Sequence, residues 1–231
     1  MRLLSHLKHT ATGVALALGA LLTLAACSES DPMEAVEYQD WAARNAADFQ
    51  QQLAKAKAAV AQAKVQYGDA WEQHCPWRLL RNYAISDTIG GTSTDTVVVE
   101  ILRQGTGAVS PIATDSVRVN YIGRYMRNAL SDNEESRLKG EIFTYTGVSK
   151  DSADVFSPNY SSPVTLYTTG TVTGFATALQ HMHIGDLWRI CMPQELGYGS
   201  SSAYVRAYST LYYDLELVGI YPVGTKPGAK P

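Results

Sequence analysis

Few residues in this 231-residue chain are placed to do chemistry, and Tyr198 is the clearest of them. It stands between Gly197 and Gly199, two residues that permit a sharp chain path. The order of elements around it is distinctive, because a short helix is followed by a hairpin with one exposed tyrosine at the root of its loop.

Two other candidates for chemistry are weaker. His181 and His183 are two residues apart at the end of a predicted helix. Side chains at that spacing do not face one another, which disfavours a shared metal ion. Cys191 lies inside a predicted strand with no evident base beside it, which disfavours a nucleophile. We therefore expect neither a metal nor a cofactor.

The elements that position the Tyr198 loop can be predicted from the spacing of apolar residues. Apolar side chains at helical spacing predict a short helix over residues 175–182. Residues 187–192 alternate as a strand, which Pro193 ends because proline cannot donate to a ladder. A second alternating strand is predicted over residues 210–218.

Further strands are predicted upstream, over residues 96–102, 117–125 and 164–167. Strands, one short helix and more strands, without strand–helix alternation, favour an antiparallel sheet over a parallel one. The predicted fold class is α+β, with a curled antiparallel β-sheet wrapped around one short α-helix.

The motifs of this region resemble the FKBP-type peptidyl-prolyl isomerases, the macrolide-binding immunophilins. The first is V-x-G-F-x-x-A-L-x-x-M-x-x-G-D-x-W-x-I-x-x-P-x-x-L-G-Y-G, which begins at Val172, and the second is S-T-L-Y-Y-D-L-E-L, which begins at Ser209. No single piece is specific, but their order and spacing are. The resemblance covers roughly residues 96–221, and it implies an FKBP-like fold and prolyl cis–trans isomerisation without a cofactor.

The resemblance also implies the site residues. The backbone N–H of Val172 and the hydroxyl of Tyr198 would be the donors, and Val205 would contact substrate from the loop. The aromatic walls would be Tyr121, Phe156, Phe175 and Tyr213. The chain departs from the family at three of these places: Phe175 replaces a tryptophan, Tyr213 replaces a phenylalanine, and Val205-Arg206 replaces an Ile-Pro pair.

The family motif G-x-x-F-D-S-S has two candidate matches here. One is the stretch 140–144, which contains Phe143, and the other is the stretch 154–158, which contains Phe156. The second precedes the strand at 164–167 by the expected interval, so Phe156 is preferred and residues 126–152 are interpreted as an insertion. Ser157 then stands where the family has an aspartate, and the lost charge predicts weaker activity.

Three functional interpretations follow from these residues. The first is a prolyl isomerase that assists the folding of envelope or secreted proteins, with proline-containing polypeptides as substrates and macrolides as ligands. The second is a proline-binding chaperone or scaffold module with the same fold and little catalysis, and the third is the fold without a working pocket. The net charge of −3, without a basic stretch, excludes a nucleic-acid partner.

Residues 1–26 resemble a bacterial lipoprotein signal peptide. Arg2 and Lys8 precede an apolar run that ends Leu-Ala-Ala before Cys27. Cleavage there would make Cys27 the acylated first residue, which predicts a lipid anchor in the bacterial cell envelope, with the outer membrane favoured. The alternative is an uncleaved or ordinary secretory signal with a coincidental cysteine.

Residues 27–70 are predicted to form a tether and a long amphipathic helix, which starts near Asp31-Pro32 and stops at Gly68-Asp69. One stripe of the helix comprises Trp41, Asn45, Phe49, Leu53, Ala56, Val60 and Tyr67. An apolar stripe of this kind needs a partner surface. It packs either on the domain that follows or on a second copy in a homodimer.

The remaining boundaries follow from composition. Residues 71–95 are expected to be a connecting strand and loop, residues 96–222 the isomerase domain, and residues 223–231 a disordered tail. Cys75 and Cys191 could pair in an oxidising envelope, but a cysteine inside a strand also behaves as a small buried hydrophobe.

Overall fold

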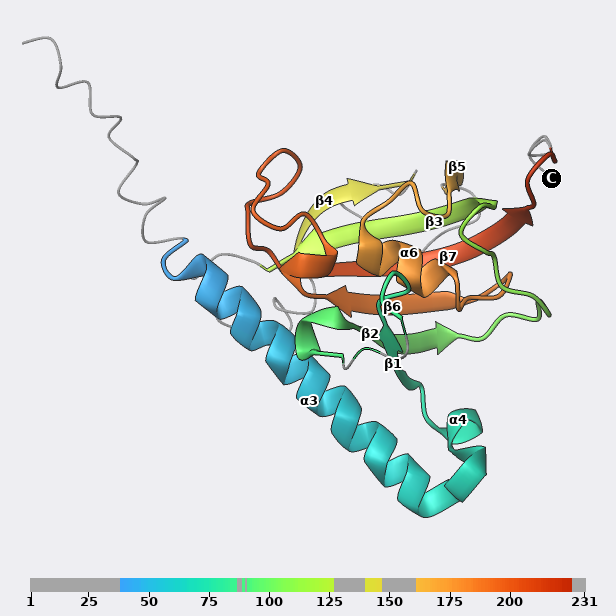
Figure 1. Cartoon of the computed structure of the whole chain (residues 1–231), viewed down its shortest axis with the longest axis horizontal. Coiled ribbons are helices and arrows are strands. Elements are labelled where there is room, and N and C mark those ends of the chain that lie inside the picture. The colour runs from blue at the N-terminus through green and yellow to red at the C-terminus, as the bar shows by residue number, and fades with distance from the viewer. Residues whose placement is uncertain (1–37, 87–88, 90, 127–139, 147–160, 226–231) are drawn as a thin grey trace, which may run out of the picture. The chain divides into compact units, whose positions relative to one another are not determined.

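One antiparallel sheet organises the chain in the computed structural model, which describes residues 38–86, 89, 91–126, 140–146 and 161–225. In this described part the sheet has seven strands in the order β1-β2-β6-β7-β3-β4, with β5 paired to β3 (Figure 1). The strands are β1 Trp77–Arg81, β2 Thr96–Arg103, β3 Ser116–Tyr125, β4 Glu141–Tyr145, β5 Val164–Tyr167, β6 Leu187–Met192 and β7 Leu211–Tyr221. Neighbouring strands pair antiparallel throughout. The predicted α+β class is confirmed.

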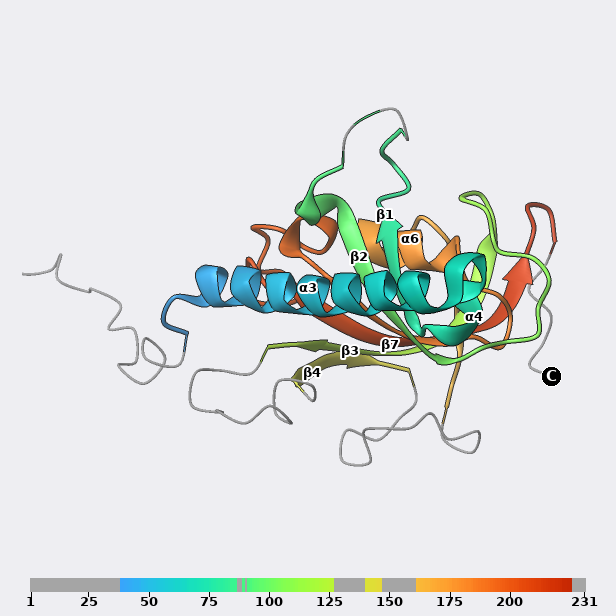
Figure 2. The same cartoon turned by 90° about the horizontal axis from the view of Figure 1, so that it is seen from below.

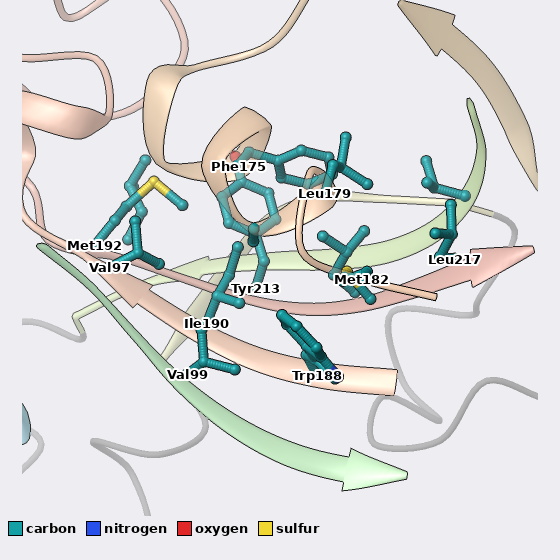
Figure 3. Packing of buried hydrophobic residues seen from close by; sticks show 14 of the residues in the cluster. Val97, Val99, Phe175, Leu179, Met182, Trp188, Ile190, Met192, Tyr213 and Leu217 are labelled. Carbon is teal, nitrogen blue, oxygen red and sulfur yellow. The ribbon is translucent and has the colours of Figure 1, made fainter. Parts of the chain in front are cut away.

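The short helix α6, Thr173–Leu179, lies on one face of the sheet and closes the main hydrophobic core. All of its residues from Gly174 onward are buried. Alternate strand residues such as Val97, Val99 and Ile190 point toward the helix, as Figure 3 shows for the packing around Phe175. Pro193 follows β6, as predicted, and the short 3-10 helix Gln194–Leu196 leads on to Tyr198.

The long helix α3, Trp41–Tyr67, packs on the opposite residues of the same strands (Figure 2). Phe49, Leu53 and Ala56 form a second core with Val98 of β2, Cys191 of β6 and Tyr212 of β7, joined by Trp77 and Leu79 of β1. Because successive side chains of a strand point to opposite faces of the sheet, one set packs in the core under α6 and the other in the core under α3. Of the two arrangements predicted for the stripe, the structure has the one within the chain, and the homodimer stays a prediction.

The start of the long helix differs from the prediction. A helix running unbroken from Asp31 to Tyr67 is wrong, because Tyr38 to Asp40 form a turn and Asp40 has a left-handed backbone with φ of 52°. The end is as predicted: Gly68 follows with φ of 55°, a conformation that glycine adopts without steric cost. A 3-10 turn Gly68–Ala70 and the one-turn helix α4, Trp71–His74, then reverse the chain toward β1.

Two predictions about sheet boundaries are corrected. Residues 126–152, interpreted as an insertion, contain β4, whose Ile-Phe-Thr-Tyr run suits a pleated surface and pairs with β3. β1, expected in the connecting segment before the domain, is the edge strand of the sheet through its pairing with β2. The sheet therefore begins before residue 96.

Cys75 and Cys191 are both buried free thiols, so the disulfide alternative does not hold. In the described ranges, no helix combines the length and apolar character that crossing a membrane requires. Cys27 and residues 1–26 lie outside the described residues.

Candidate active site

A cavity of about 150 Å³ opens where α6 begins, between β3, β4, β7 and the Tyr198 loop. Its lining residues are Tyr121, Thr144, Leu166, Gly170, Thr171, Val172, Phe175, Tyr198 and Tyr213. An apolar cavity of about this volume admits a benzene ring. It is therefore large enough for the smaller, five-membered ring of a proline.

Aromatic rings in edge-to-face contact make up its walls. Tyr213 is central, with ring centroids 5.1 Å from Phe175, 5.7 Å from Phe143 and 6.2 Å from Tyr121, all near perpendicular. Phe143 also meets Tyr198 at 6.3 Å and 82°. Such contacts fix ring orientation, because the positive edge of one ring faces the negative face of the next. The walls therefore hold one another in place before any ligand arrives.

The strand register around Gly123 brings these rings together. Gly123 of β3 pairs with Tyr213 of β7 on one side and with Thr144 of β4 on the other. A Cβ at Gly123 would lie 2.6 Å from Cγ2 of Thr144, 2.7 Å from Cε1 of Tyr213 and 3.0 Å from Cε1 of Phe143. Glycine is thus what lets two walls of the cavity approach each other.

Tyr198 contributes a polar group, its hydroxyl, to the cavity. Its hydroxyl and that of Tyr213 are joined by a hydrogen bond. Burial raises the pKa of both phenols, so each hydroxyl keeps its proton across the physiological range. The ring of Tyr204, 73% exposed, lies 5.2 Å from that of Tyr198 and extends the aromatic surface out of the cavity.

A buried threonine fixes the base of the cavity wall. Thr146 Oγ1 accepts a hydrogen bond from the backbone N–H of Tyr121 at 2.9 Å and donates to Oδ1 of Asn120 at 3.3 Å. Thr146 N–H donates to the carbonyl of Tyr121 at 3.0 Å. These bonds tie the end of β4 to β3 beside the ring of Tyr121.

The structure gathers five of the predicted site residues at this cavity: Tyr121, Val172, Phe175, Tyr198 and Tyr213. Val172 is the residue that caps the start of α6. Val205 is not among the lining residues: it is 7% exposed and packs in the main core. Its contact with substrate stays a prediction.

Phe156 and Ser157, the preferred matches to the family motif, lie outside the described residues. The other stretch is at the cavity, with Phe143 against the rings of Tyr198 and Tyr213 and Thr144 in the lining. A threonine thus follows the wall phenylalanine where the motif has aspartate. Gly123 lies in the predicted strand 117–125, but its place between two walls of the cavity was not predicted, and Thr144 belongs to the stretch that was not preferred. Leu166, Gly170 and Thr171 also line the cavity and were not predicted as site residues.

Comparison with known proteins agrees with this geometry. Residues 107–218 match the family described as FKBP-type peptidyl-prolyl cis-trans isomerase. The chain is 30% identical over 122 residues to the FKBP-type 22 kDa peptidyl-prolyl cis-trans isomerase of Escherichia coli strain K12, covering 52% of this chain and 48% of that protein. It is 29% identical over 126 residues to the macrophage infectivity potentiator of Trypanosoma cruzi, covering 54% of this chain and 53% of that protein. The chain thus spans about half the length of the curated relatives it matches.

The similar solved structures are more distant in sequence. A peptidyl-prolyl cis-trans isomerase from Pseudomonas syringae pv. tomato is 20% identical, with a TM-score of 0.42 over 74% of this chain and 95% of that one. FkpA from Escherichia coli is 19% identical, with a TM-score of 0.42 over 92% of this chain and 82% of that one.

Proposed function

Residues 107–218 belong to the FKBP-type peptidyl-prolyl cis-trans isomerases, and we propose that the cavity at the start of α6 catalyses rotation about X–Pro peptide bonds. The observation that carries this proposal is the closed set of aromatic rings around a space of proline size, with the Tyr198 hydroxyl at its edge. Fold membership alone would not establish the activity.

The chemistry requires neither a nucleophile nor a metal. Uncatalysed X–Pro rotation meets a barrier of about 20 kcal/mol, because resonance keeps the amide planar. In the twisted transition state the carbonyl is decoupled from its nitrogen. A cavity that binds the twisted form more tightly than the planar form lowers the barrier by the difference.

The aromatic walls supply the first part of that preference. Phe143, Phe175 and Tyr213 would enclose the pyrrolidine ring and exclude water from the amide nitrogen. Few solvent molecules then remain to stabilise the planar, polar amide. Because the surroundings have a low dielectric, each hydrogen bond inside is stronger than it would be in water.

Two donors supply the second part. The hydroxyl of Tyr198 and the backbone N–H of Val172 would hold the carbonyl oxygens that flank the rotating bond. Val172 lies at the start of a helix, where backbone N–H groups are directed away from the helix toward a ligand. Macrolides, implied as ligands by the family resemblance, would compete for the same donors and walls.

The setting we propose is the bacterial cell envelope. The signal-like residues 1–26 and the acylation site Cys27 support a lipid anchor, with unfolded envelope or secreted polypeptides as substrates. Labelling with a radioactive fatty acid tests this directly: Cys27→Ser would abolish incorporation if the anchor is correct. Equal incorporation by the variant would contradict it.

A second function is favoured by one observation. Thr144 follows Phe143 at the position where the family motif carries an aspartate, so the cavity lacks that charge. A module that binds proline segments with little catalysis would keep the walls and donors and lose only the charge.

The test is cis–trans exchange of a proline-containing tetrapeptide, followed by NMR with the full chain in detergent. We expect catalysed exchange, with kcat/KM lowered about tenfold in Tyr198→Phe, since a lost donor costs roughly 1–3 kcal/mol. The matched control is Tyr167→Phe, a tyrosine 71% exposed on β5 and outside the cavity, which should match the unaltered chain. Peptide binding without exchange would establish the binding module instead.

A further inference from the structure

We propose that the first turns of α3 hold the catalytic cavity in shape, so that Trp41 and Asn45 are positioning residues of the isomerase site. This inference rests on the proposed function for its catalytic readout. Its observations are two sets of contacts that run from the helix toward the cavity: one through aromatic rings to Phe143, and one through buried hydrogen bonds to the loop that starts at Tyr198.

The aromatic contacts reach the Phe143 wall. The Trp41 ring, on a side chain 7% exposed, meets the ring of Tyr125 edge-on at 6.1 Å and 76°. Tyr125 in turn lies 6.1 Å from Phe143, whose ring contacts both Tyr198 and Tyr213. Trp41 is therefore separated from the cavity wall by one ring, and each ring restricts the orientation of the next.

The hydrogen bonds reach the loop that starts at Tyr198. Trp41 Nε1 donates to Oγ of Ser209 at 3.2 Å. Asn45 Oδ1 accepts from the backbone N–H of Thr210 at 2.8 Å, and the Thr210 hydroxyl donates to the carbonyl of Asn45 at 2.8 Å. The loop is closed at its other end, where the N–H of Tyr208 donates to the carbonyl of Gly199 at 2.7 Å.

These hydrogen bonds are buried, and each donor has an acceptor, so they fix how the helix is oriented against the loop. Asn45, Ser209 and Thr210 are 1%, 3% and 1% exposed, and the Asn45 amide also donates to the carbonyl of Trp41 at 2.9 Å. A buried polar group without its partner is costly, so the helix has one favourable register against the loop. That register sets where the loop leaves the base of Tyr198.

The later turns of α3 do something different. Leu53 and Ala56 pack on Val98 and Cys191, on the sheet face opposite the main core, and line no part of the catalytic cavity. The first turns of α3 therefore contact residues around the cavity, whereas its middle turns pack on the sheet. Leu53→Ala is accordingly a matched control for Trp41→Ala, because both remove a large buried side chain from the same helix.

The catalytic experiment compares these variants in the full chain. We expect Trp41→Ala to raise KM for the tetrapeptide about three- to tenfold, the size of one aromatic contact, with kcat nearly unchanged. Trp41→Phe keeps the ring contact with Tyr125 and should recover most of the affinity. Leu53→Ala should lower the urea midpoint and leave KM unchanged. An equal rise of KM in Leu53→Ala would overturn the inference, because general loosening would then explain both.

A peptide-free measurement keeps the inference separate from the proposed function. The aromatic NMR resonances of Phe143 and Tyr198 should shift in Trp41→Ala and stay in place in Leu53→Ala. Ser209→Ala removes the acceptor of Trp41 Nε1 together with the hydroxyl that donates to the Arg206 carbonyl. It tests the loop contact if Trp41→Ala does not fold, and should shift Tyr198. Unshifted resonances would overturn the positioning role. Shifted resonances in a chain without any catalysis would contradict the proposed function alone.

Discussion

The hydroxyl of Tyr198 is hydrogen-bonded to the hydroxyl of Tyr213, a residue that stands where the FKBP family usually has phenylalanine. This bond lowers the pKa of Tyr198 against the larger raising effect of burial. Donation from Tyr213 to the Tyr198 oxygen leaves the Tyr198 proton to face a substrate carbonyl, and the Tyr213→Phe variant tests this arrangement. Donation to a phenol oxygen strengthens that phenol as a donor in its turn.

Replacing Tyr213 by phenylalanine should accordingly weaken catalysis, although it restores the usual family residue. We expect kcat/KM to fall about two- to fivefold, less than in Tyr198→Phe, because one hydrogen bond of net worth near 1 kcal/mol is lost indirectly. The measurement is tetrapeptide exchange by NMR. An increase in kcat/KM would mean that Tyr213 competes with the substrate for Tyr198.

Gly123→Ala should damage the site more than the fold. The added Cβ would lie within 3.0 Å of Tyr213, Thr144 and Phe143, so the two walls must move apart. Overpacking of this kind costs typically about 1–3 kcal/mol of stability. We expect KM to rise more than tenfold while circular dichroism keeps the β-sheet signal. Gly91→Ala is the control, because Gly91 lies outside the cavity lining and its Cβ would meet no atom closer than 3.6 Å.

Restoring the family carboxylate distinguishes the two candidate motif matches. Thr144→Asp places a negative charge in the lining of the cavity, where the low dielectric makes it effective on a developing dipole. We expect kcat to rise severalfold in Thr144→Asp and to stay unchanged in Ser157→Asp. A rise of kcat in Ser157→Asp and none in Thr144→Asp would instead place Phe156 in the cavity wall, as the sequence alone favoured.

Stability should fall on the alkaline side. Burial raises the pKa of Cys191, Tyr212 and Tyr213, so the folded chain keeps these protons at a pH where the unfolded chain releases them. The unfolded state then binds fewer protons, and the free energy of unfolding declines from about pH 8.5, where a free thiol begins to titrate. Urea midpoints at neutral pH and at about pH 10.5 measure the decline, which should be shallower in Tyr213→Phe. Equal midpoints would contradict it.

Much of the fold could be predicted because its signals are local. Alternation over residues 187–192, the stop at Pro193 and the glycine pair around Tyr198 each depend on a few adjacent residues, and the structure has all of these features. The helix stripe from Trp41 to Ala56 was equally visible, since burial on one face requires that spacing.

The cavity wall could not be predicted in the same way. Phe143 and Phe156 each precede a hydroxyl residue in similar contexts, and only pairing of β4 with β3 distinguishes them. The burial of Val205 could not be predicted either, because nothing in the adjacent residues shows that this side chain packs in the main core. Asn45 was interpreted as part of an apolar stripe, but its buried side chain accepts a hydrogen bond from the backbone N–H of Thr210, 165 positions later in the chain.

The docking of α3 also has a consequence for biosynthesis. The helix α3 leaves the ribosome before the sheet, whereas its partners Ser209, Thr210 and Tyr212 lie just before β7 or in it, and β7 is the last strand of the described sheet to be made. Contacts spanning 164 to 168 residues form slowly, because most of the chain must be in place first. Until then the apolar side chains of Trp41, Phe49 and Leu53 are exposed, and a chaperone can bind the nascent chain through them. The isomerase site would thus reach its final shape only when β7 packs against α3.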